Sequence, residues 1–144
     1  MKLGKKFLVM GLPGSGKSTL AKVLVEELKA VWLNADEIRK EYNDWDFSVE
    51  GRHKQAFRMR CLADGVVKAG KIAVADFIAP TRKARAEFDA DYTVWMDTIL
   101  EGRYEDTNAM FQKPNNCDYH VSQWFADTHV QLIDVVTAWM KRNK

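Results

Sequence analysis

Phe7-Leu8-Val9-Met10-Gly11-Leu12-Pro13-Gly14-Ser15-Gly16-Lys17-Ser18 is the stretch of this chain that decides its fold. Its last eight residues fit the pattern GxxxxGK[ST], and the apolar run before them predicts a buried strand. Glycines allow successive backbone N–H groups to turn toward one anion, and the helix that follows points its positive end at the same place. The pattern therefore indicates a loop that holds the phosphates of a nucleotide.

Each position of this phosphate loop has an expected task. The Lys17 ammonium is expected to reach the terminal phosphates of a nucleoside triphosphate, and the Ser18 hydroxyl to bind Mg²⁺. A glycine-rich turn between a strand and a helix, without a ligand, is the alternative interpretation. We expect ATP as the nucleotide, held by Gly11, Leu12, Pro13, Gly14, Ser15, Gly16, Lys17, Ser18 and Thr19.

Length and composition limit the architecture. A chain of 144 residues can bury one sizeable core, so we expect residues 1–144 to form a single domain. The net charge of +2 lacks the basic excess of a dedicated nucleic-acid binder, so no nucleic acid polymer is expected as a partner. No apolar run is long enough to span a bilayer, so we expect a cytoplasmic protein without a membrane partner. Cys61 and Cys117 match no zinc or redox spacing and are expected to be buried or idle thiols.

Strands and helices alternate along the chain. The predicted strands are residues 6–10, 31–34, 71–76, 92–97 and 119–122, and the predicted helices are residues 17–29, 36–42, 50–69, 80–90 and 127–141. The last helix is expected to bury Val130, Ile133, Val136 or Thr137, and Met140. Ser48 is the expected N-cap of the third helix, and Pro80 is expected to open the fourth. This order predicts an α/β protein with the three-layer fold of P-loop NTPases, a central parallel five-stranded sheet with helices on both faces.

Residues that follow a strand are the candidate site residues, because parallel sheets bind ligands at the carboxyl ends of their strands. Asp36 and Arg39 follow the second strand at an i, i+3 spacing that places both on one helix face. An ordinary surface ion pair shows the same spacing. Asp76 ends the third strand, where phosphate-loop proteins often place an acid near Mg²⁺, although a carboxylate there also caps turns.

Arg52 begins an otherwise apolar helical stripe that continues through Ala56, Met59 and Ala63. An arginine at an inward position needs an anionic partner, because burying its charge unpaired is very unfavourable. A ligand phosphate or Asp36 meets that need. A rim arginine that reaches water along its own stem is the alternative. The basic run at residues 82–85 is expected to be a solvated helix face, and no role is assigned to the histidines or tryptophans.

Further segments after the phosphate loop occur in a recognisable order. They are Leu33-Asn34-Ala35-Asp36-Glu37-Ile38-Arg39, Asp46-Phe47-Ser48-Val49-Glu50-Gly51-Arg52, Leu62-Ala63-Asp64 with Ala69-Gly70, and Phe77-Ile78-Ala79-Pro80-Thr81-Arg82. Together they resemble the adenylylsulfate kinase family, which carries GDN[IV]R, FSxExR and FISPYR segments in this order. The resemblance covers residues 5–90 and, more loosely, 114–122. It implies transfer of the γ-phosphate of ATP to the 3′-hydroxyl of adenosine 5′-phosphosulfate in sulfate assimilation, and it suggests a homodimer.

The resemblance also implies a role for individual side chains. Asp36 would orient or deprotonate the acceptor hydroxyl, so Lys17 and Asp36 are the expected catalytic residues. Arg39 and Arg52 would hold the phosphosulfate anion, and Phe47 would stack on the adenine. The expected substrate-binding residues are Asp36, Arg39, Phe47, Arg52, Gln55, Ile78 and Ala79; Ser18 and Asp76 are expected to bind the metal ion.

Several positions depart from the family pattern. Ala79 stands where the family has a serine that can be phosphorylated in some members. Glu37 replaces an asparagine, and Gln55 stands where asparagine is usual. The lid segment, residues 102–118, is short and is expected to be a mobile loop in which Arg103 contacts ATP. These departures keep two alternatives open: a kinase for another small hydroxyl acceptor or nucleotide, and a nucleotide-binding module without catalysis.

Overall fold

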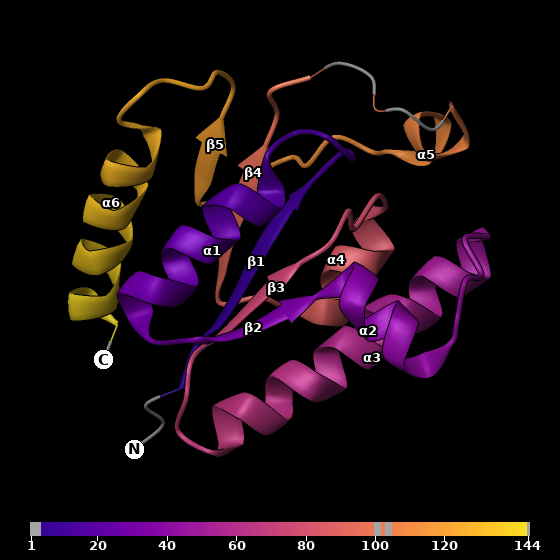
Figure 1. The fold of residues 1–144 in the computed structure, drawn as a ribbon, viewed down its shortest axis with the longest axis horizontal. Helices are drawn as coiled ribbons and strands as arrows, with labels where there is room; N and C mark the ends of the chain where they lie inside the picture. The colour runs from indigo at the N-terminus through magenta and orange to yellow at the C-terminus, as the bar shows by residue number, and fades with distance from the viewer. Residues whose placement is uncertain (1–3, 100–101, 103–104, 144) are drawn as a thin grey trace.

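A parallel sheet forms the centre of the computed structural model, which describes residues 4–99, 102 and 105–143 (Figure 1). Within these residues the sheet has five strands in the order β2-β3-β1-β4-β5. They are β1 (Lys6–Gly11), β2 (Val31–Asn34), β3 (Ala73–Asp76), β4 (Tyr92–Met96) and β5 (Tyr119–Val121). Every neighbouring pair is parallel, so the predicted parallel five-stranded sheet is confirmed.

Helices cover both faces of this sheet. They are α1 (Lys17–Leu28), α2 (Ala35–Tyr42), α3 (Val49–Lys68), α4 (Arg82–Phe88), α5 (Glu105–Met110) and α6 (Thr128–Arg142). Helices α1 and α6 pack on one face, and α3 and α4 on the other (Figure 1). The described part of the chain contains no helix with the length and apolar character needed to cross a membrane.

Strand β1 joins the two hydrophobic cores because its successive side chains point to opposite faces. Phe7 and Val9 belong to the core shared with α1 and α6, whereas Leu8 and Met10 belong to the core shared with α3 and α4. All six residues of β1 are buried, as expected for a central strand of a parallel sheet. The phosphate loop therefore starts from a fully buried central strand.

Side-chain caps fix where three helices begin. The Asn34 side chain accepts a hydrogen bond from Glu37 N at 3.1 Å, and Ser48 Oγ accepts one from Gly51 N at 3.1 Å, which confirms the predicted cap of α3. The prediction that Pro80 opens α4 is wrong. Thr81 is the N-cap instead, because its hydroxyl accepts a hydrogen bond from Ala84 N and satisfies a donor of the first turn.

The predicted stripe of α6 is also partly wrong. The helix buries Thr128, Leu132 and Val136, which follow each other at i, i+4 spacing, whereas Val130 is 48% exposed. Several apolar stripes run along this sequence, and packing against α1 selects one of them. Neither cysteine is fully buried, so the prediction of buried thiols is wrong: Cys61 is exposed and Cys117 is half-buried. The lid segment contains α5, so it is not a loop throughout.

Candidate functional site

A cavity of about 550 Å³ lies where the carboxyl ends of β1, β2 and β3 meet. One wall is formed by the phosphate loop and the start of α1. The other walls come from α2, the aromatic loop (residues 44–48), the first turns of α3, residues 76–80 and α5. Segments from most of the chain length therefore meet around one space.

The phosphate loop curls tightly into the first turn of α1. Ser15 N donates to Leu12 O at 3.2 Å, and Lys17 Nζ donates to the same carbonyl oxygen at 3.2 Å. Of the predicted ATP-binding residues, Pro13, Gly14, Lys17 and Ser18 line the cavity. Leu12 and Ser15 are buried behind the loop, and Thr19 lies exposed on α1. Arg103, also predicted to bind ATP, lies outside the described residues.

The two predicted metal ligands lie side by side. Ser18 Oγ donates to Asp76 Oδ2 at 2.8 Å, and Asn34 Nδ2 donates to the same oxygen at 3.0 Å. The register of the sheet sets this arrangement, because Asn34 pairs with Asp76 across β2 and β3. Asp76 is only 2% exposed, so its carboxylate points into the protein rather than into bulk water.

Arg39 lines the cavity, as does Asp36, but its partners lie in the aromatic loop. Arg39 Nη1 donates to the carbonyl oxygens of Asp44 at 3.0 Å and Asp46 at 3.1 Å. The Arg39 guanidinium also lies 4.4 Å from the centroid of the Phe47 ring. Burial lowers the pKa of Arg39, and the charge of Asp44 opposes part of that effect. The alternative of an ordinary surface ion pair is therefore wrong for Arg39, which is 4% exposed and faces the cavity as predicted.

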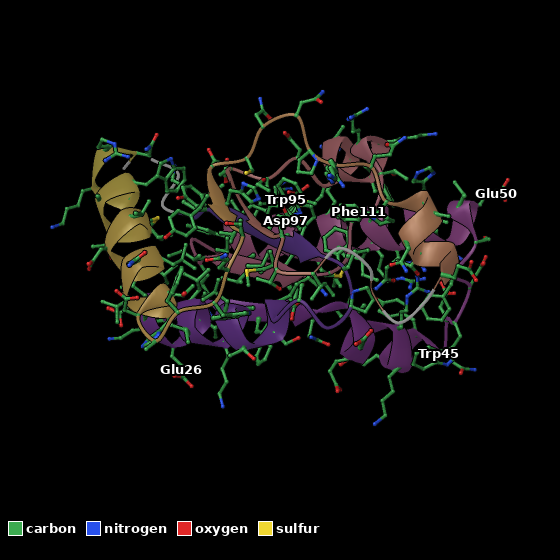
Figure 2. All side chains as sticks on the ribbon, turned by 90° about the horizontal axis from the view of Figure 1, so that it is seen from above. Glu26, Trp45, Glu50, Trp95, Asp97 and Phe111 are labelled. Carbon is green, nitrogen blue, oxygen red and sulfur yellow. The ribbon has the colours of Figure 1, made fainter. Side chains whose placement is uncertain are left out.

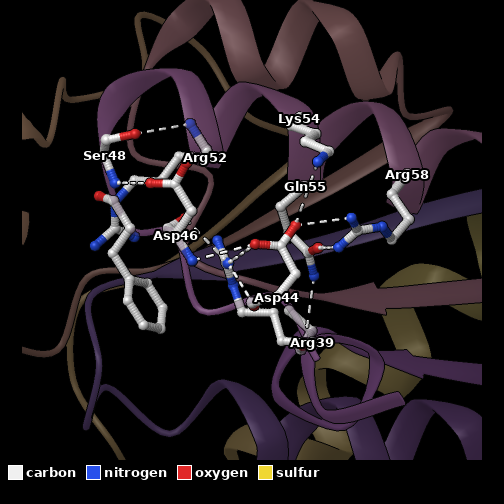
Figure 3. Close-up of polar contacts among 11 residues, drawn as sticks. Arg39, Asp44, Asp46, Ser48, Arg52, Lys54, Gln55 and Arg58 are labelled. Carbon is white, nitrogen blue, oxygen red and sulfur yellow. Dashed lines mark hydrogen bonds and ion pairs between the residues drawn. The ribbon is translucent and has the colours of Figure 1, made fainter. Parts of the chain in front are cut away.

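Three cationic side chains lie close to the carboxylate of Asp44 (Figure 3). Its carboxylate lies 2.8 Å from Arg58 Nη2, 3.8 Å from Arg39 Nη1 and 4.0 Å from Lys54 Nζ. The hydrogen bond from Arg58 is the main reason why the pKa of Asp44 lies below its ordinary value. Asp44 therefore links α2 and α3 through the loop that carries Phe47.

Arg52 connects the aromatic loop with the lid segment. Its Nε donates to Phe47 O at 3.0 Å, and its Nη2 donates to Thr107 Oγ1 at 2.8 Å. Arg52 is 8% exposed, so the prediction of an inward-facing arginine is confirmed. The Phe47 ring remains 41% exposed and lines the cavity between the two arginines and the phosphate loop wall.

The remaining predicted substrate-binding residues also line the cavity. Gln55 is 3% exposed, accepts a hydrogen bond from Arg58 at 2.7 Å and donates to Ala35 O at 3.3 Å. Ile78 and Ala79 form part of the wall after β3, and Ala79 has a positive φ of 47°. The structure thus brings all seven predicted substrate-binding residues to one cavity.

Two residues of the basic run of α4, Arg82 and Lys83, are exposed as predicted, but Arg85 contacts protein carbonyl groups instead of solvent. Arg85 Nε donates to Ala79 O at 2.8 Å, and its Nη2 donates to the carbonyl oxygens of Pro80 and Gln112. Burial, and after it the charge of Arg82, lowers the pKa of Arg85 to about 10. Gln112 N also donates to Pro80 O at 2.7 Å. The end of the lid segment is therefore fastened to the cavity wall that contains Ala79.

Six residues that line the cavity were not among the predicted site residues: Asn34, Ala35, Trp45, Phe77, Pro80 and Thr107. Thr107 gave no local signal, because its contact with Arg52 spans 55 positions of the chain. Trp45 lines the cavity with its ring centroid 6.5 Å from that of Phe47, and its position beside a recognised motif was a usable signal. Seen from above, Trp45 lies at the end of the molecule formed by α2 and α3, and Phe111 lies near its middle (Figure 2).

Comparison with known proteins places this geometry in a family. The family model for adenylylsulphate kinase matches residues 4–118. This chain belongs to the adenylylsulphate kinase family. It is 37% identical over 121 residues to a probable adenylyl-sulfate kinase of Bacillus subtilis, an alignment that covers 74% of this chain and 60% of the relative. It is 35% identical over 115 residues to an adenylyl-sulfate kinase of Burkholderia ambifaria, covering 70% of this chain and 64% of the relative. The chain thus spans less than two thirds of the length of these relatives.

Solved structures show the same fold. A Mycobacterium tuberculosis APS kinase, CysC, solved in complex with AMPPNP and APS, superposes with a TM-score of 0.74 at 23% identity, covering 93% of this chain and 98% of that one. A structure described as APE1195 superposes with a TM-score of 0.82 at 19% identity, covering 99% and 97%. A sugar kinase from Janibacter, at 0.72 and 18% identity, covers 96% and 95%. The fold is that of a P-loop kinase.

Proposed function

We propose that this chain transfers the γ-phosphate of ATP to the 3′-hydroxyl of adenosine 5′-phosphosulfate, giving 3′-phosphoadenosine 5′-phosphosulfate and ADP. One observation carries the proposal: a single cavity joins a phosphate loop on one side to two buried arginines and an exposed phenylalanine ring on the other. Family membership supports the same reaction, because the matched family is that of adenylylsulphate kinases.

The donor side suits ATP with Mg²⁺. Ser18 and Asp76 offer a hydroxyl and a carboxylate oxygen 2.8 Å apart at the cavity wall, which are hard oxygen ligands of the kind that Mg²⁺ prefers. Within the described part of the chain no group of three or more His, Cys, Asp or Glu could hold a metal, which fits an ion held mainly by substrate phosphates and water. When bound, Mg²⁺ neutralises charge that develops on the phosphates, and Lys17 adds a second positive charge.

The acceptor side suits a planar base that carries an anionic group. The Phe47 ring would stack on the adenine, and Arg39 and Arg52 would hold the phosphosulfate. Gln55, Ile78 and Ala79 would shape the remaining wall.

Asp36 would orient the 3′-hydroxyl toward the γ-phosphate and accept its proton. Its position on the wall of the cavity that Lys17 and Arg39 also line supports that role. Most of the rate enhancement would come from in-line placement and charge neutralisation, which phosphoryl transfer requires. Arg103 would approach ATP from the lid segment.

The reaction itself tests this proposal. The purified chain is incubated with ATP, Mg²⁺ and adenosine 5′-phosphosulfate, and the nucleotides are separated by chromatography, with the Lys17→Ala variant as the control. We expect the 3′-phosphorylated product and an equal amount of ADP. Turnover of a different hydroxyl acceptor in preference to this one would overturn the acceptor assignment. Tight ATP binding without product from any acceptor in a panel would show a non-catalytic nucleotide-binding module.

We further propose that residues 1–144 act as one kinase domain, that residues 102–118 form its lid, and that two such chains pair. The contact of Thr107 in α5 with Arg52 supports the lid assignment, and the family resemblance supports the pairing. Analytical ultracentrifugation, with and without nucleotide, measures the number of chains in the particle. A single-chain mass under both conditions would contradict the pairing.

A further inference from the structure

The carbonyl oxygen of Ser15, inside the phosphate loop, accepts hydrogen bonds from two side chains far away in the sequence. Thr98 Oγ1 donates to it at 2.7 Å, and Trp124 Nε1 donates to it at 3.2 Å. Thr98 follows β4, and Trp124 follows β5. Two neighbouring strands therefore deliver a donor to the same backbone atom.

The Trp124 ring also lies directly against the next residue of the loop. A Cβ atom added to Gly16 would lie 2.5 Å from Cζ2 and 2.7 Å from Nε1 of Trp124, so a side chain at this position would displace the ring. Gly16 has a φ of 98°, in the left-handed region that favours glycine, and it is the N-cap of α1. The ring thus occupies the space that the missing side chain leaves.

These contacts have a directional consequence for the Gly16 N–H group. The Ser15–Gly16 peptide unit is planar, and no cis peptide bond occurs in the described chain, so the Ser15 C=O and the Gly16 N–H point in opposite directions. Two donors that hold the carbonyl oxygen on the outer side of the loop therefore hold the N–H on its inner side. Inward N–H groups are the donors by which a phosphate loop binds its anion.

Trp124 is itself held in place at the start of α6. Phe125 N donates to Thr128 Oγ1 at 2.7 Å, and Thr128 N donates to Phe125 O at 3.2 Å. Thr128 is only 4% exposed, so this turn is anchored in the core although Trp124 is 41% exposed. The donor to Ser15 therefore starts from a fixed point rather than from a loose surface loop.

We propose that Thr98 and Trp124 are positioning residues that orient the Ser15–Gly16 peptide and thereby set the affinity of the phosphate loop for a polyphosphate chain. The inference deepens the proposed function, because it rests on the use of this loop for phosphate. It assigns the effect to the phosphate chain and not to the nucleobase or the acceptor.

Binding measurements with two ligands test the proposal. Dissociation constants of ATP and of inorganic tripolyphosphate are measured by calorimetry, with Mg²⁺, for the wild type and for Thr98→Val and Trp124→Phe. The first variant removes a hydroxyl at nearly constant volume, and the second keeps a ring over Gly16 but removes its N–H. We expect each variant to raise the dissociation constants of both ligands about three- to tenfold, as for the loss of one net hydrogen bond. The acceptor KM should not change.

Controls separate this role from general damage to the fold. Trp32→Phe, on β2 and 37% exposed, should bind both ligands like the wild type. Thr98→Ser retains the hydroxyl and should restore most of the affinity that Thr98→Val loses, even if the valine variant proves unstable.

Two outcomes would overturn the inference. Unchanged affinity for both ligands in both variants excludes an orienting role. If Trp124→Phe lowers the affinity for ATP but not for tripolyphosphate, Trp124 contacts the base instead. A wild type that binds tripolyphosphate but leaves adenosine 5′-phosphosulfate unphosphorylated disproves the proposed function while leaving this inference intact.

Discussion

The phosphate loop and the wall that we propose for the acceptor (the acceptor wall: α2, residues 44–48, the first turns of α3 and α5) line one cavity, yet they are built in different ways. The loop is a contiguous run, residues 11–18, whose capacity for an anion resides in backbone N–H groups and glycine conformations. The acceptor wall combines α2, the aromatic loop, α3 and α5, and its arginines are held by side-chain contacts such as Arg52 with Thr107. The residues of the backbone site are therefore contiguous in the sequence, although two distant side chains contact it through Ser15 O, whereas the side-chain site is assembled from the whole fold.

Lys17→Ala should have the largest effect and should act on the donor side alone. We expect kcat to fall by about two to three orders of magnitude, the scale seen when one preorganised charge donor is removed from a transition state. Circular dichroism and the thermal midpoint should stay close to the wild type, because Lys17 is half-exposed. Lys22→Ala, an exposed position on the same helix, is the matched control. Full turnover by a purified Lys17→Ala protein would contradict the assignment.

Arg52→Ala should weaken binding at the acceptor wall without affecting the phosphate loop. We expect the acceptor KM to rise by about ten- to hundredfold, in keeping with the loss of charge-assisted hydrogen bonds, and the ATP KM to stay near that of the wild type. Initial-rate measurements with each substrate varied in turn give the two constants. Arg142→Ala, exposed at the end of α6, should leave both unchanged. An equal rise for ATP and acceptor would argue against a wall that works separately from the loop.

Asp44→Asn should loosen the aromatic loop at nearly constant shape. The variant removes the negative charge that Arg39, Lys54 and Arg58 share, so we expect an acceptor KM about three- to tenfold higher and an unchanged ATP KM. Steady-state kinetics at low and high salt would measure this. An acceptor KM that does not move would show that the backbone of residues 44–48 holds Phe47 in place without the charge.

The same variant should alter the dependence of stability on pH. Because the pKa of Asp44 in the folded protein lies below its ordinary value, its contribution to stability is fully present above the unfolded-state pKa of about 4 and is lost as the pH falls through the folded-state value. Denaturant unfolding of both proteins should therefore show the wild type more stable than Asp44→Asn at neutral pH. The difference should shrink below about pH 4. A difference that stays constant down to pH 3 would disprove this role of the carboxylate.

Thr107→Val should have the smallest effect, and it tests whether α5 contributes to the acceptor wall or to the phosphate loop. It removes the hydroxyl that accepts a hydrogen bond from Arg52 while keeping the volume of a residue that is 1% exposed. We expect the acceptor KM to rise about two- to fivefold, as for one modest hydrogen bond, and Thr107→Ser to restore it. A larger effect on ATP than on the acceptor would show that α5 serves the donor side instead.

The local sequence was sufficient to predict features that short sequence patterns specify. The Ser48 cap, the strand before the phosphate loop and the inward position of Arg52 all follow from short sequence patterns, and the structure confirms them. The juxtaposition of Ser18 with Asp76 was predictable as well, because Ser18 follows β1 and Asp76 ends the adjacent parallel strand β3.

Prediction failed where several local solutions were equally good. Helix α4 begins after a Thr81 cap rather than at Pro80, and Leu132 rather than Val130 is buried in α6, because tertiary packing selects among similar helix starts and stripes. Arg85 belongs to a basic run that looks solvated, yet carbonyl oxygens of Ala79, Pro80 and Gln112 surround it. Nothing within one turn of α4 reveals those carbonyl groups.

By itself, the sequence determined the alternation of strands and helices, the phosphate loop and most of the residues that line the cavity, since periodicity and short motifs act through neighbouring residues. Only the tertiary structure decided that Asp44 of the aromatic loop pairs with cations of α2 and α3, that Thr107 contacts Arg52, and that Thr98 and Trp124 donate to Ser15. The physical reason is separation along the chain: these groups meet because the sheet and the packed helices bring distant segments together, and no local pattern encodes that meeting.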